Sequence, residues 1–195
     1  MIKELTKTEN ARRLTAWKHI NRHIRTYSKH VSLDRPEFQH AWNDDTRQYI
    51  TTPIYVIETL TPIDGIPRLE DTMHILPPRF RISAQRMIAE PQHNTRHLNL
   101  PLYEITDTDL ERIERAYKEK RNMIRINGVV FTPCYIRDVI RMIAPNIKKY
   151  PVYMYAETPT SNAFLRSDIG SAVLAPINTK DGEYDAYIKE HNFID

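Results

Sequence analysis

Apolar side chains recur at steps of three and four residues near the start of the chain, and this spacing predicts one long amphipathic helix. Thr6 and Glu9 have the spacing of a capping box, so the helix is expected to begin there. It is expected to continue to Val31, because the apolar stripe extends that far. The stripe consists of Leu14, Trp17, Ile20, Ile24, Tyr27 and Val31.

A second, shorter helix is expected to follow, because Asp34 can cap it and Pro36 suits its first turn. Phe38, Ala41 and Trp42 would form its apolar face, and the helix would end at residues 43–45. The two helices would then pack as a helical hairpin over residues 1–46. Asp44 and Asp45 also suggest metal binding, but no further ligand stands at a suitable spacing, so a solvated helix end is the preferred interpretation.

The remaining residues, 47–195, are expected to form a mixed body, so the predicted fold class is α+β with a mostly antiparallel sheet. Residues 48–60 are rich in β-branched and aromatic side chains and predict a strand, with Pro53 at a sheet edge or dividing the strand in two. Residues 69–90 are ambiguous: residues 79–83 fit a strand, and Ser83 could cap a short helix.

A polar loop is expected over residues 91–100, because Pro91 and two asparagines disfavour a helix there. His93 and His97 stand four residues apart, a spacing that would suit a metal site on a helix, but in a loop they are taken as solvated side chains. A strand over residues 98–105 is expected next. The pattern of residues 106–121 then predicts a surface helix with acidic residues early and basic residues late.

Residues 123–178 carry the most consistent local signals: a hairpin, a helix and three strands. Asn127-Gly128 favours a type I′ turn between short strands, and Thr132-Pro133 favours a helix start. The helix should bury its isoleucines and valine and expose Arg137, Asp138 and Arg141. The three strands are expected over residues 150–157, 164–168 and 171–178. The tail, 179–195, is polar with a last helix around Tyr184, Tyr187 and Ile188.

The net charge of +3 is unevenly distributed along the chain. Residues 1–33 contain eight basic and two acidic residues and so carry +6, which leaves −3 for the other 162 residues. The first helix could therefore follow a phosphate backbone or an acidic partner. A solvated helix face is the simpler alternative, and membrane-surface binding fits the narrow stripe less well. The candidate phosphate-contacting residues are Arg12, Arg13, Lys18, Arg22, Arg25 and Lys29.

Composition narrows the function classes. Four glycines and the absence of a Gly-rich phosphate motif argue against a nucleotide-binding enzyme of that type, and one cysteine excludes an intramolecular disulfide and a Cys-based zinc site. Cys134 stands at a helix start, but no base is linked to it in the sequence, so packing is preferred over catalysis. No apolar run approaches the ~18–20 residues of a membrane span. A cytoplasmic protein without cofactor or metal is expected.

The sequence I-N-G-V-V-F-T-P-C-Y-I-R-D-V-I and the closing V-L-A-P-I resemble the last domain of the bacterial DNA polymerase sliding clamp (β subunit) and short clamp-like proteins of phages and mobile elements. In that family a helix with a Tyr-Leu/Ile pair precedes three antiparallel strands, and the last strand lines a pocket for partner peptides. The resemblance implies that Val173, Ala175, Pro176 and Ile177 line such a pocket. Asn178 replaces the family's basic residue, and a clamp protomer needs three such domains.

Three functions remain open from the sequence. The leading one is a non-enzymatic module of phage or mobile-element type that binds a protein partner through the clamp-like unit, 123–178, and contacts double-stranded DNA through the first helix. The second is a protein-only inhibitor or adaptor whose basic helix docks on an acidic protein. The third is a metal-dependent hydrolase using His93, His97 and distant carboxylates. A homo-oligomer is also left open.

Overall fold

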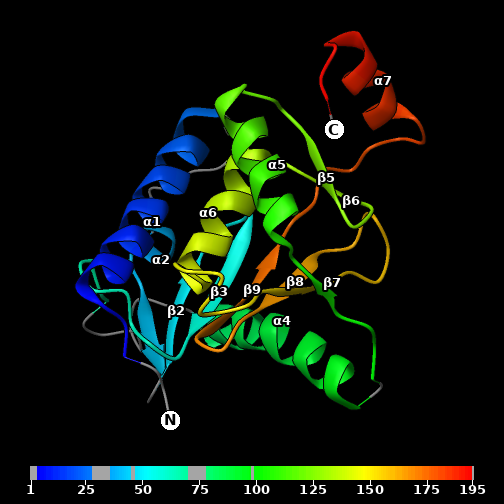
Figure 1. Ribbon diagram of the computed structural model, residues 1–195. Coiled ribbons are helices and arrows are strands. Elements are labelled where there is room, and N and C mark those ends of the chain that lie inside the picture. The colour runs from blue at the N-terminus through cyan, green and yellow to red at the C-terminus, as the bar shows by residue number, and fades with distance from the viewer. Residues whose placement is uncertain (1–3, 28–35, 45–46, 70–77, 98, 195) are drawn as a thin grey trace.

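An antiparallel sheet of seven described strands forms the centre of the molecule, with helices on both faces (Figure 1). The computed structural model describes residues 4–27, 36–44, 47–69, 78–97 and 99–194. The α+β class predicted from the sequence is confirmed. The strand order is β1-β2-β3-β9-β8-β7-β4, and the strands are β1 (Trp42–Asp44), β2 (Arg47–Thr51), β3 (Tyr55–Thr59), β4 (Tyr103–Glu104), β7 (Tyr153–Tyr155), β8 (Ala163–Arg166) and β9 (Gly170–Leu174).

The sheet is built from two similar units. In each, a long helix precedes a meander of three antiparallel strands: α1 (Lys7–Tyr27) precedes β1-β2-β3, and α6 (Pro133–Ile143) precedes β7-β8-β9. The last strands of the two meanders pair antiparallel, with Ile57 opposite Ala172. The two units are thus arranged as if by a two-fold axis between β3 and β9, and the sequence indicated this order only for the second unit.

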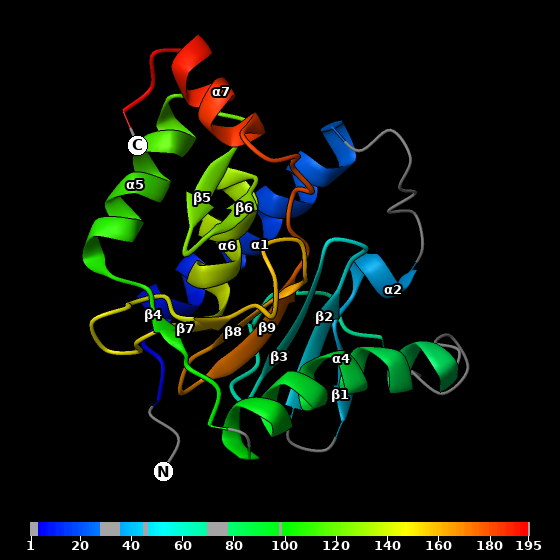
Figure 2. The ribbon, with the colours of Figure 1, turned by 90° about the vertical axis from the view of Figure 1, so that its right-hand side faces the viewer.

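The two faces of the sheet have separate cores. Helices α1, α6 and α5 (Asp107–Lys118) cover one face, and α4 (Pro78–His97) crosses the other, as two perpendicular views show (Figures 1 and 2). Side chains alternate along β3, so Ile57 packs in the core under α1 and α6, whereas Val56 packs with Ala84 and Ile88 of α4. Both faces are buried, which explains why the central strands lack a polar face.

The short hairpin β5 (Ile124–Ile126) and β6 (Val129–Phe131) confirms the Asn-Gly prediction. Asn127 has φ 45° and Gly128 has φ 80°, the two positive values that a type I′ turn requires. Thr132 and Pro133 begin α6 as the sequence predicts. The predicted last helix is also confirmed: α7 (Glu183–Glu190) buries Tyr184 and Tyr187.

The second helix of the predicted hairpin is much shorter in the structure. Among the described residues of this segment, 36–44, only α2 (Pro36–Gln39) is helical. Trp42 is a fully buried residue of β1 that stacks on Tyr49 with ring centroids 4.3 Å apart. The predicted boundary between residues 46 and 47 falls between β1 and β2, which pair antiparallel. Burial of the large indole against β2 outweighs the local helix signals. Asp45 lies outside the described residues.

Residues 78–97 depart most from the prediction. The loop expected over residues 91–100 is wrong, because one helix, α4, covers most of it and includes Pro91. The same helix decides the ambiguous stretch before it: residues 79–83 are helical and form no strand, and the short helix that Ser83 could cap is part of this longer one. Ala84, Ile88 and Thr95 are buried, so the helix gains enough from packing on the sheet to tolerate an internal proline. The predicted strand over residues 98–105 shrinks to β4. Pro53, in contrast, divides the predicted strand 48–60 into β2 and β3, as one of the two interpretations held.

Candidate functional site

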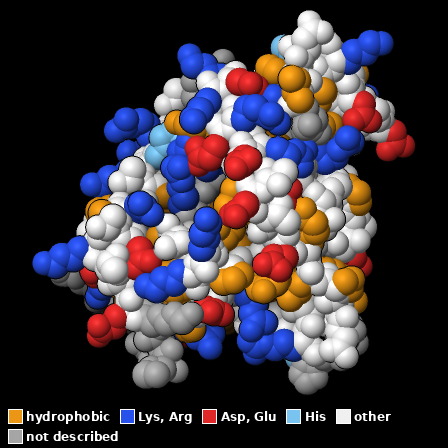
Figure 3. Space-filling model, in the orientation of Figure 1, with side chains coloured by type: hydrophobic (Ala, Val, Ile, Leu, Met, Phe, Trp, Pro, Cys, Tyr) orange, Lys and Arg blue, Asp and Glu red, His pale blue; other side chains and the backbone are white. Residues whose placement is uncertain are grey.

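The outward face of α1 carries exposed basic side chains. Of the six candidate phosphate-contacting residues, Arg12, Lys18, Arg22 and Arg25 are exposed, and Lys29 lies outside the described residues. Lys18, Arg22 and Arg25 stand at steps of four and three, so they lie in one row along the helix. We call Arg12, Lys18, Arg22 and Arg25 together the outward basic face. Lys and Arg side chains follow the α1 edge of the molecule in Figure 3, with few acidic ones between them.

The fifth described candidate, Arg13, has to be corrected, because it is fully buried and cannot meet a phosphate. Its guanidinium donates hydrogen bonds to the carbonyl of Met142 (2.6 Å), the carbonyl of Thr61 (2.8 Å) and Oγ1 of Thr59 (2.6 Å). Burial lowers the pKa of Arg13 to about 10, so it stays charged at neutral pH. Its role is to join α1 to the end of α6 and to the end of β3.

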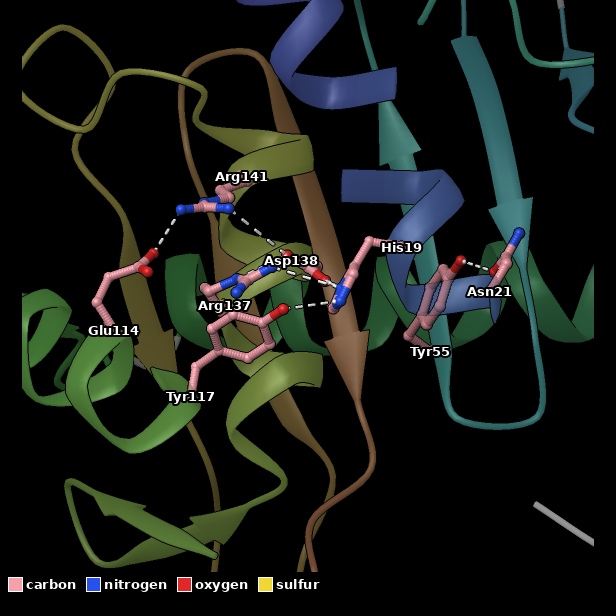
Figure 4. A network of polar contacts seen from close by, with 8 residues as sticks. All are labelled: His19, Asn21, Tyr55, Glu114, Tyr117, Arg137, Asp138 and Arg141. Carbon is pink, nitrogen blue, oxygen red and sulfur yellow. Dashed lines mark hydrogen bonds and ion pairs between the residues drawn. The ribbon is translucent and has the colours of Figure 1, made fainter. Parts of the chain in front are cut away.

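A buried polar network connects α1, α5 and α6 (Figure 4). His19 of α1 contacts the carboxylate of Asp138 through Nδ1, and the hydroxyl of Tyr117 lies 3.0 Å from its Nε2. Asp138 is fully buried, and its other oxygen accepts a hydrogen bond from Nε of Arg137 at 2.9 Å and forms an ion pair with Nη2 at 2.8 Å. Arg137 in turn lies over the ring of Tyr117, 3.4 Å from its centroid.

In the neutral form of His19, the network determines which ring nitrogen carries the proton. A carboxylate only accepts, so Nδ1 of His19 donates to Asp138 and Nε2 accepts from Tyr117. Burial opposes the charge of Arg137 and is the largest single effect, but the Asp138 carboxylate and the Tyr117 hydroxyl together outweigh it and raise the pKa of Arg137. The group is an Asp–His–Tyr chain that ends in a phenol, an arrangement able to move a proton but without an aligned nucleophile among the described residues.

The sequence does not indicate this network, and the predicted outward position of Arg137 and Asp138 on α6 is wrong. Both are buried because α6 lies between α1 and α5 and has little exposed face. The partners of Asp138 and Tyr117 are 119 and 98 positions away along the chain, so no local spacing could have indicated them. Only Arg141 is partly exposed as expected, and it pairs with Glu114 of α5 at 2.6 Å.

A cavity of about 640 Å³ opens beside the network. We call it the basic pocket. Arg121 pairs with Glu119 at 2.6 Å, whereas Lys118 and Lys120 are exposed. The basic pocket is lined by residues of α1, the end of α5, the loop after α5 and the start of α6. They are His19, His23, Tyr117, Lys118, Lys120, Arg121, Asn122, Thr132, Pro133, Cys134 and Tyr135.

Cys134 lies in the wall of the basic pocket, but it is not an activated thiol. The side chain is buried, and burial raises the pKa of the Cys134 thiol to about 12, with the Asp138 charge adding to the shift. The thiolate is the reactive form, so almost none is present at neutral pH. The structure agrees with the packing role expected from the sequence.

A second cavity, of about 230 Å³, lies between α4 and the turn that joins β2 and β3. We call it the apolar groove. Val173 and Ala175, two of the four candidate peptide-binding residues, line it together with Phe38, Thr51, Thr52, Pro53, Ile54, Tyr55, Val56, Phe80, Ser83, Ala84, Met87 and Asn162. Ile82 and Met87 of α4 are 53% and 37% exposed, which is unusual for large apolar side chains in this molecule.

The other two peptide-binding candidates lie beyond the end of β9, half-buried, and neither lines the apolar groove. The amide of Ala175 donates to the carbonyl of Ile54, and the amide of Ile177 donates to the carbonyl of Val130. Pro176 and Ile177 thus carry the chain from the end of β9, the central strand, to the β5-β6 hairpin. The V-L-A-P-I sequence is divided between the groove and this crossing.

His93 and His97 belong to α4 and not to a loop, and His93 is exposed. Within the described part of the chain, no three His, Cys, Asp or Glu side chains stand close enough to hold a metal ion. Among the same residues, no helix combines the length and the apolar character needed to cross a membrane.

Comparisons with known proteins add no relative. No protein-family model matches the chain, and neither a curated protein nor a solved structure is significantly similar to it.

Proposed function

We propose that this protein is a non-enzymatic binding module that holds the backbone of a nucleic acid along α1. The observation that carries the proposal is the outward basic face. Arg12, Lys18, Arg22 and Arg25 are exposed, and no described carboxylate forms an ion pair with any of them. Exposed cations without local partners are available to replace the counterions of a phosphate backbone.

The neighbouring helices differ from α1 in part, because three of their basic residues are held by ion pairs, whereas Arg115 and Lys118 of α5 form none with a described residue. On α5 and α6 the basic residues Arg112, Arg137 and Arg141 each pair with an acidic side chain of the same two helices. The other side of α1 is held in place, because Arg13 bonds to the carbonyl of Met142 and His19 to Asp138, both in α6. The outward basic face therefore stands on a helix whose position is rigidly set, which suits contact with a regular backbone.

The repeated unit of the fold lends further support. The clamp resemblance expects a helix followed by three antiparallel strands within residues 123–178, and that order recurs at α1 and β1-β2-β3. Two such units joined side by side would give this chain one clamp-like domain rather than half of one. A module of that kind, of phage or mobile-element type, would act next to DNA without encircling it as a single copy.

Charge removal on α1 tests the proposal. We expect the triple variant Lys18→Gln, Arg22→Gln, Arg25→Gln to lower the affinity for a 20-base-pair duplex at least tenfold. The slope of log Kd against log salt should fall by about 2–3, since each lost phosphate contact removes about one unit. Fluorescence anisotropy over a salt series measures both quantities.

The matched control removes the same charge elsewhere: Lys148→Gln, Lys180→Gln and Lys189→Gln, all exposed. It should leave the salt slope within one unit of the wild-type value. An equal loss of duplex affinity in both triple variants would show that binding depends on the net charge and not on the outward basic face. Absence of duplex binding by the wild type at low salt would replace the proposal with docking of α1 on an acidic protein.

A second function is favoured by the apolar groove: capture of a short partner peptide. Val173 and Ala175 line it, and Met87, another lining residue, leaves apolar surface exposed. Arg79 and Arg86 are exposed next to the lining residues Phe80 and Met87, so the expected peptide combines apolar anchors with acidic flanks.

Filling the groove tests this second function. We expect Ala175→Trp to weaken binding of an acidic-apolar peptide, selected from a peptide library on the wild-type protein, at least tenfold because the indole occupies the anchor space. Ala89→Trp, at an exposed position of α4 outside the groove lining, is the matched control and should bind normally. If the library selection enriched no peptide, or if every enriched peptide bound Ala175→Trp as tightly as the wild type, the groove would not be a peptide site.

A further inference from the structure

The basic pocket is lined by five side chains that carry or can accept positive charge, and no acidic side chain of the described residues lines it. The five come from three segments: His19 and His23 from α1, Lys118 from the end of α5, and Lys120 and Arg121 from the loop that follows. The nearest carboxylates are already neutralised, because Asp138 is held by Arg137 behind His19 and Glu119 is held by Arg121. The free charge that faces the cavity is positive.

The start of α6 strengthens this field. Thr132, Pro133, Cys134 and Tyr135 line the pocket, so the positive end of the helix dipole lies at the cavity wall. The side chain of Thr132 makes no capping hydrogen bond to the helix. Its hydroxyl is therefore not committed to the first turn of α6 and is placed where a ligand oxygen could accept a hydrogen bond from it.

Aromatic rings give the pocket surfaces for a flat group. Tyr117 and Tyr135 line it, and His19 and His23 meet them edge-on, with ring centroids 5.4 Å and 5.3 Å apart. These contacts fix the orientation of both tyrosine rings. A cavity of about 640 Å³ lies within the range of small-molecule sites, ~300–1,000 Å³. It has room for a ring as well as a charged group.

The contacts of the three cationic side chains, Arg121, Lys118 and Lys120, indicate a different role for Arg121 than for the two lysines. Arg121 is buried, pairs with Glu119 and also donates to the carbonyl of Ile194, so it mainly holds the loop in place. Lys118 and Lys120 are exposed, and neither forms an ion pair with a described residue. Their ammonium groups can turn toward an anion in the pocket. Two such groups and a helix start match the double charge of a phosphate monoester better than the single charge of a backbone diester.

We propose that the basic pocket binds a phosphate monoester attached to an aromatic base, with Lys118 and Lys120 at the phosphate and Tyr117 and Tyr135 at the base. Two sources share this chemistry: a free nucleotide and the phosphorylated end of a nucleic-acid strand. The proposal does not require the outward basic face, which lies on the exposed side of α1.

Calorimetric titration with thymidine 5′-monophosphate, at a physiological salt concentration that screens distant charges beyond ~8 Å, tests the free nucleotide. Thymidine is the matched ligand without the phosphate. Anisotropy with a fluorescent single strand of ten nucleotides, with and without a 5′-phosphate, tests the strand end. We expect at least one phosphorylated probe to bind tenfold or more tightly than its unphosphorylated partner. Preference for the mononucleotide identifies a nucleotide site, and preference for the strand identifies an end-binding site.

The double variant Lys118→Gln, Lys120→Gln should remove this preference, since both changes lie on exposed side chains and leave the core intact. The variant Lys148→Gln, Lys180→Gln makes the same change of charge away from the pocket lining and should keep it. The α1 triple variant should also keep it, which separates this inference from the proposed function. Equal binding of phosphorylated and unphosphorylated probes, or equal loss in both lysine pairs, would overturn the assignment.

Discussion

Replacement of Arg13 by methionine should lower the free energy of unfolding by about 3 kcal/mol, a large fraction of the stability of a typical domain. Methionine retains much of the aliphatic volume but donates no hydrogen bond. The carbonyls of Met142 and Thr61 and the hydroxyl of Thr59 would lose a charged donor in a site closed to water. Each buried acceptor left without its partner costs about 1–3 kcal/mol.

Urea unfolding followed by circular dichroism measures the loss. The matched control is Arg12→Met, one residue earlier on the same helix, where the side chain is exposed and the expected change is within about 0.5 kcal/mol. The pair also separates a buried arginine that joins helices from an exposed one, although both are among the predicted phosphate-contacting residues. A similar change in both variants would show that Arg13 is not the residue that joins α1 to α6.

The contrast between these neighbours shows what a sequence can and cannot indicate about a charged helix. Helical spacing separates the two, since Arg13 stands four positions before Trp17 and seven before Ile20, in line with the apolar stripe, whereas Arg12 stands outside it. The spacing gives no partner for a charge on that stripe. Arg13 is buried because α6 ends with an unsatisfied carbonyl at Met142, 129 positions further along the chain. A guanidinium can occupy a core when such acceptors converge on it, and their convergence is a property of the tertiary fold.

Local chemistry predicted the structure well wherever it acts alone. Asn127-Gly128 adopts the dihedral angles that only a few residues tolerate, and Thr132-Pro133 begins a helix without help from distant residues. Pro91 shows the opposite case. It argues against a helix, yet α4 continues through it because the sheet offers a second apolar face that the sequence does not reveal.

The candidate sites also differ in whether local sequence or tertiary structure brings their residues together. The outward basic face follows from composition and helical period alone, so four of its residues could be named from the sequence and are exposed in the structure. The basic pocket and the apolar groove are assembled from several elements each. Val173 and Ala175 were named only through the clamp resemblance, and nothing in the spacing of Lys118 and His23 brings them together.

Replacement of Asp138 by alanine is the second substitution expected to have a large effect, about 3–5 kcal/mol of unfolding free energy. The change leaves the buried guanidinium of Arg137 without its counter-ion and Nδ1 of His19 without its acceptor. Asp138→Asn should cost clearly less. Its amide oxygen can accept from Arg137, and its amide nitrogen can donate to Nδ1 if the imidazole proton moves to Nε2.

Chemical denaturation gives the three stabilities, and nitrogen chemical shifts of His19 report which ring nitrogen carries the proton. Glu114→Ala is the matched control, because it breaks the more exposed pair with Arg141 on the same helices and should cost no more than about 1 kcal/mol. If Asp138→Ala were as mild as Glu114→Ala, the network would not hold the three helices together. A proton that stays on Nδ1 in Asp138→Asn would show that the carboxylate does not set the direction of the Asp–His–Tyr chain, whereas its transfer to Nε2 would show that the carboxylate sets it.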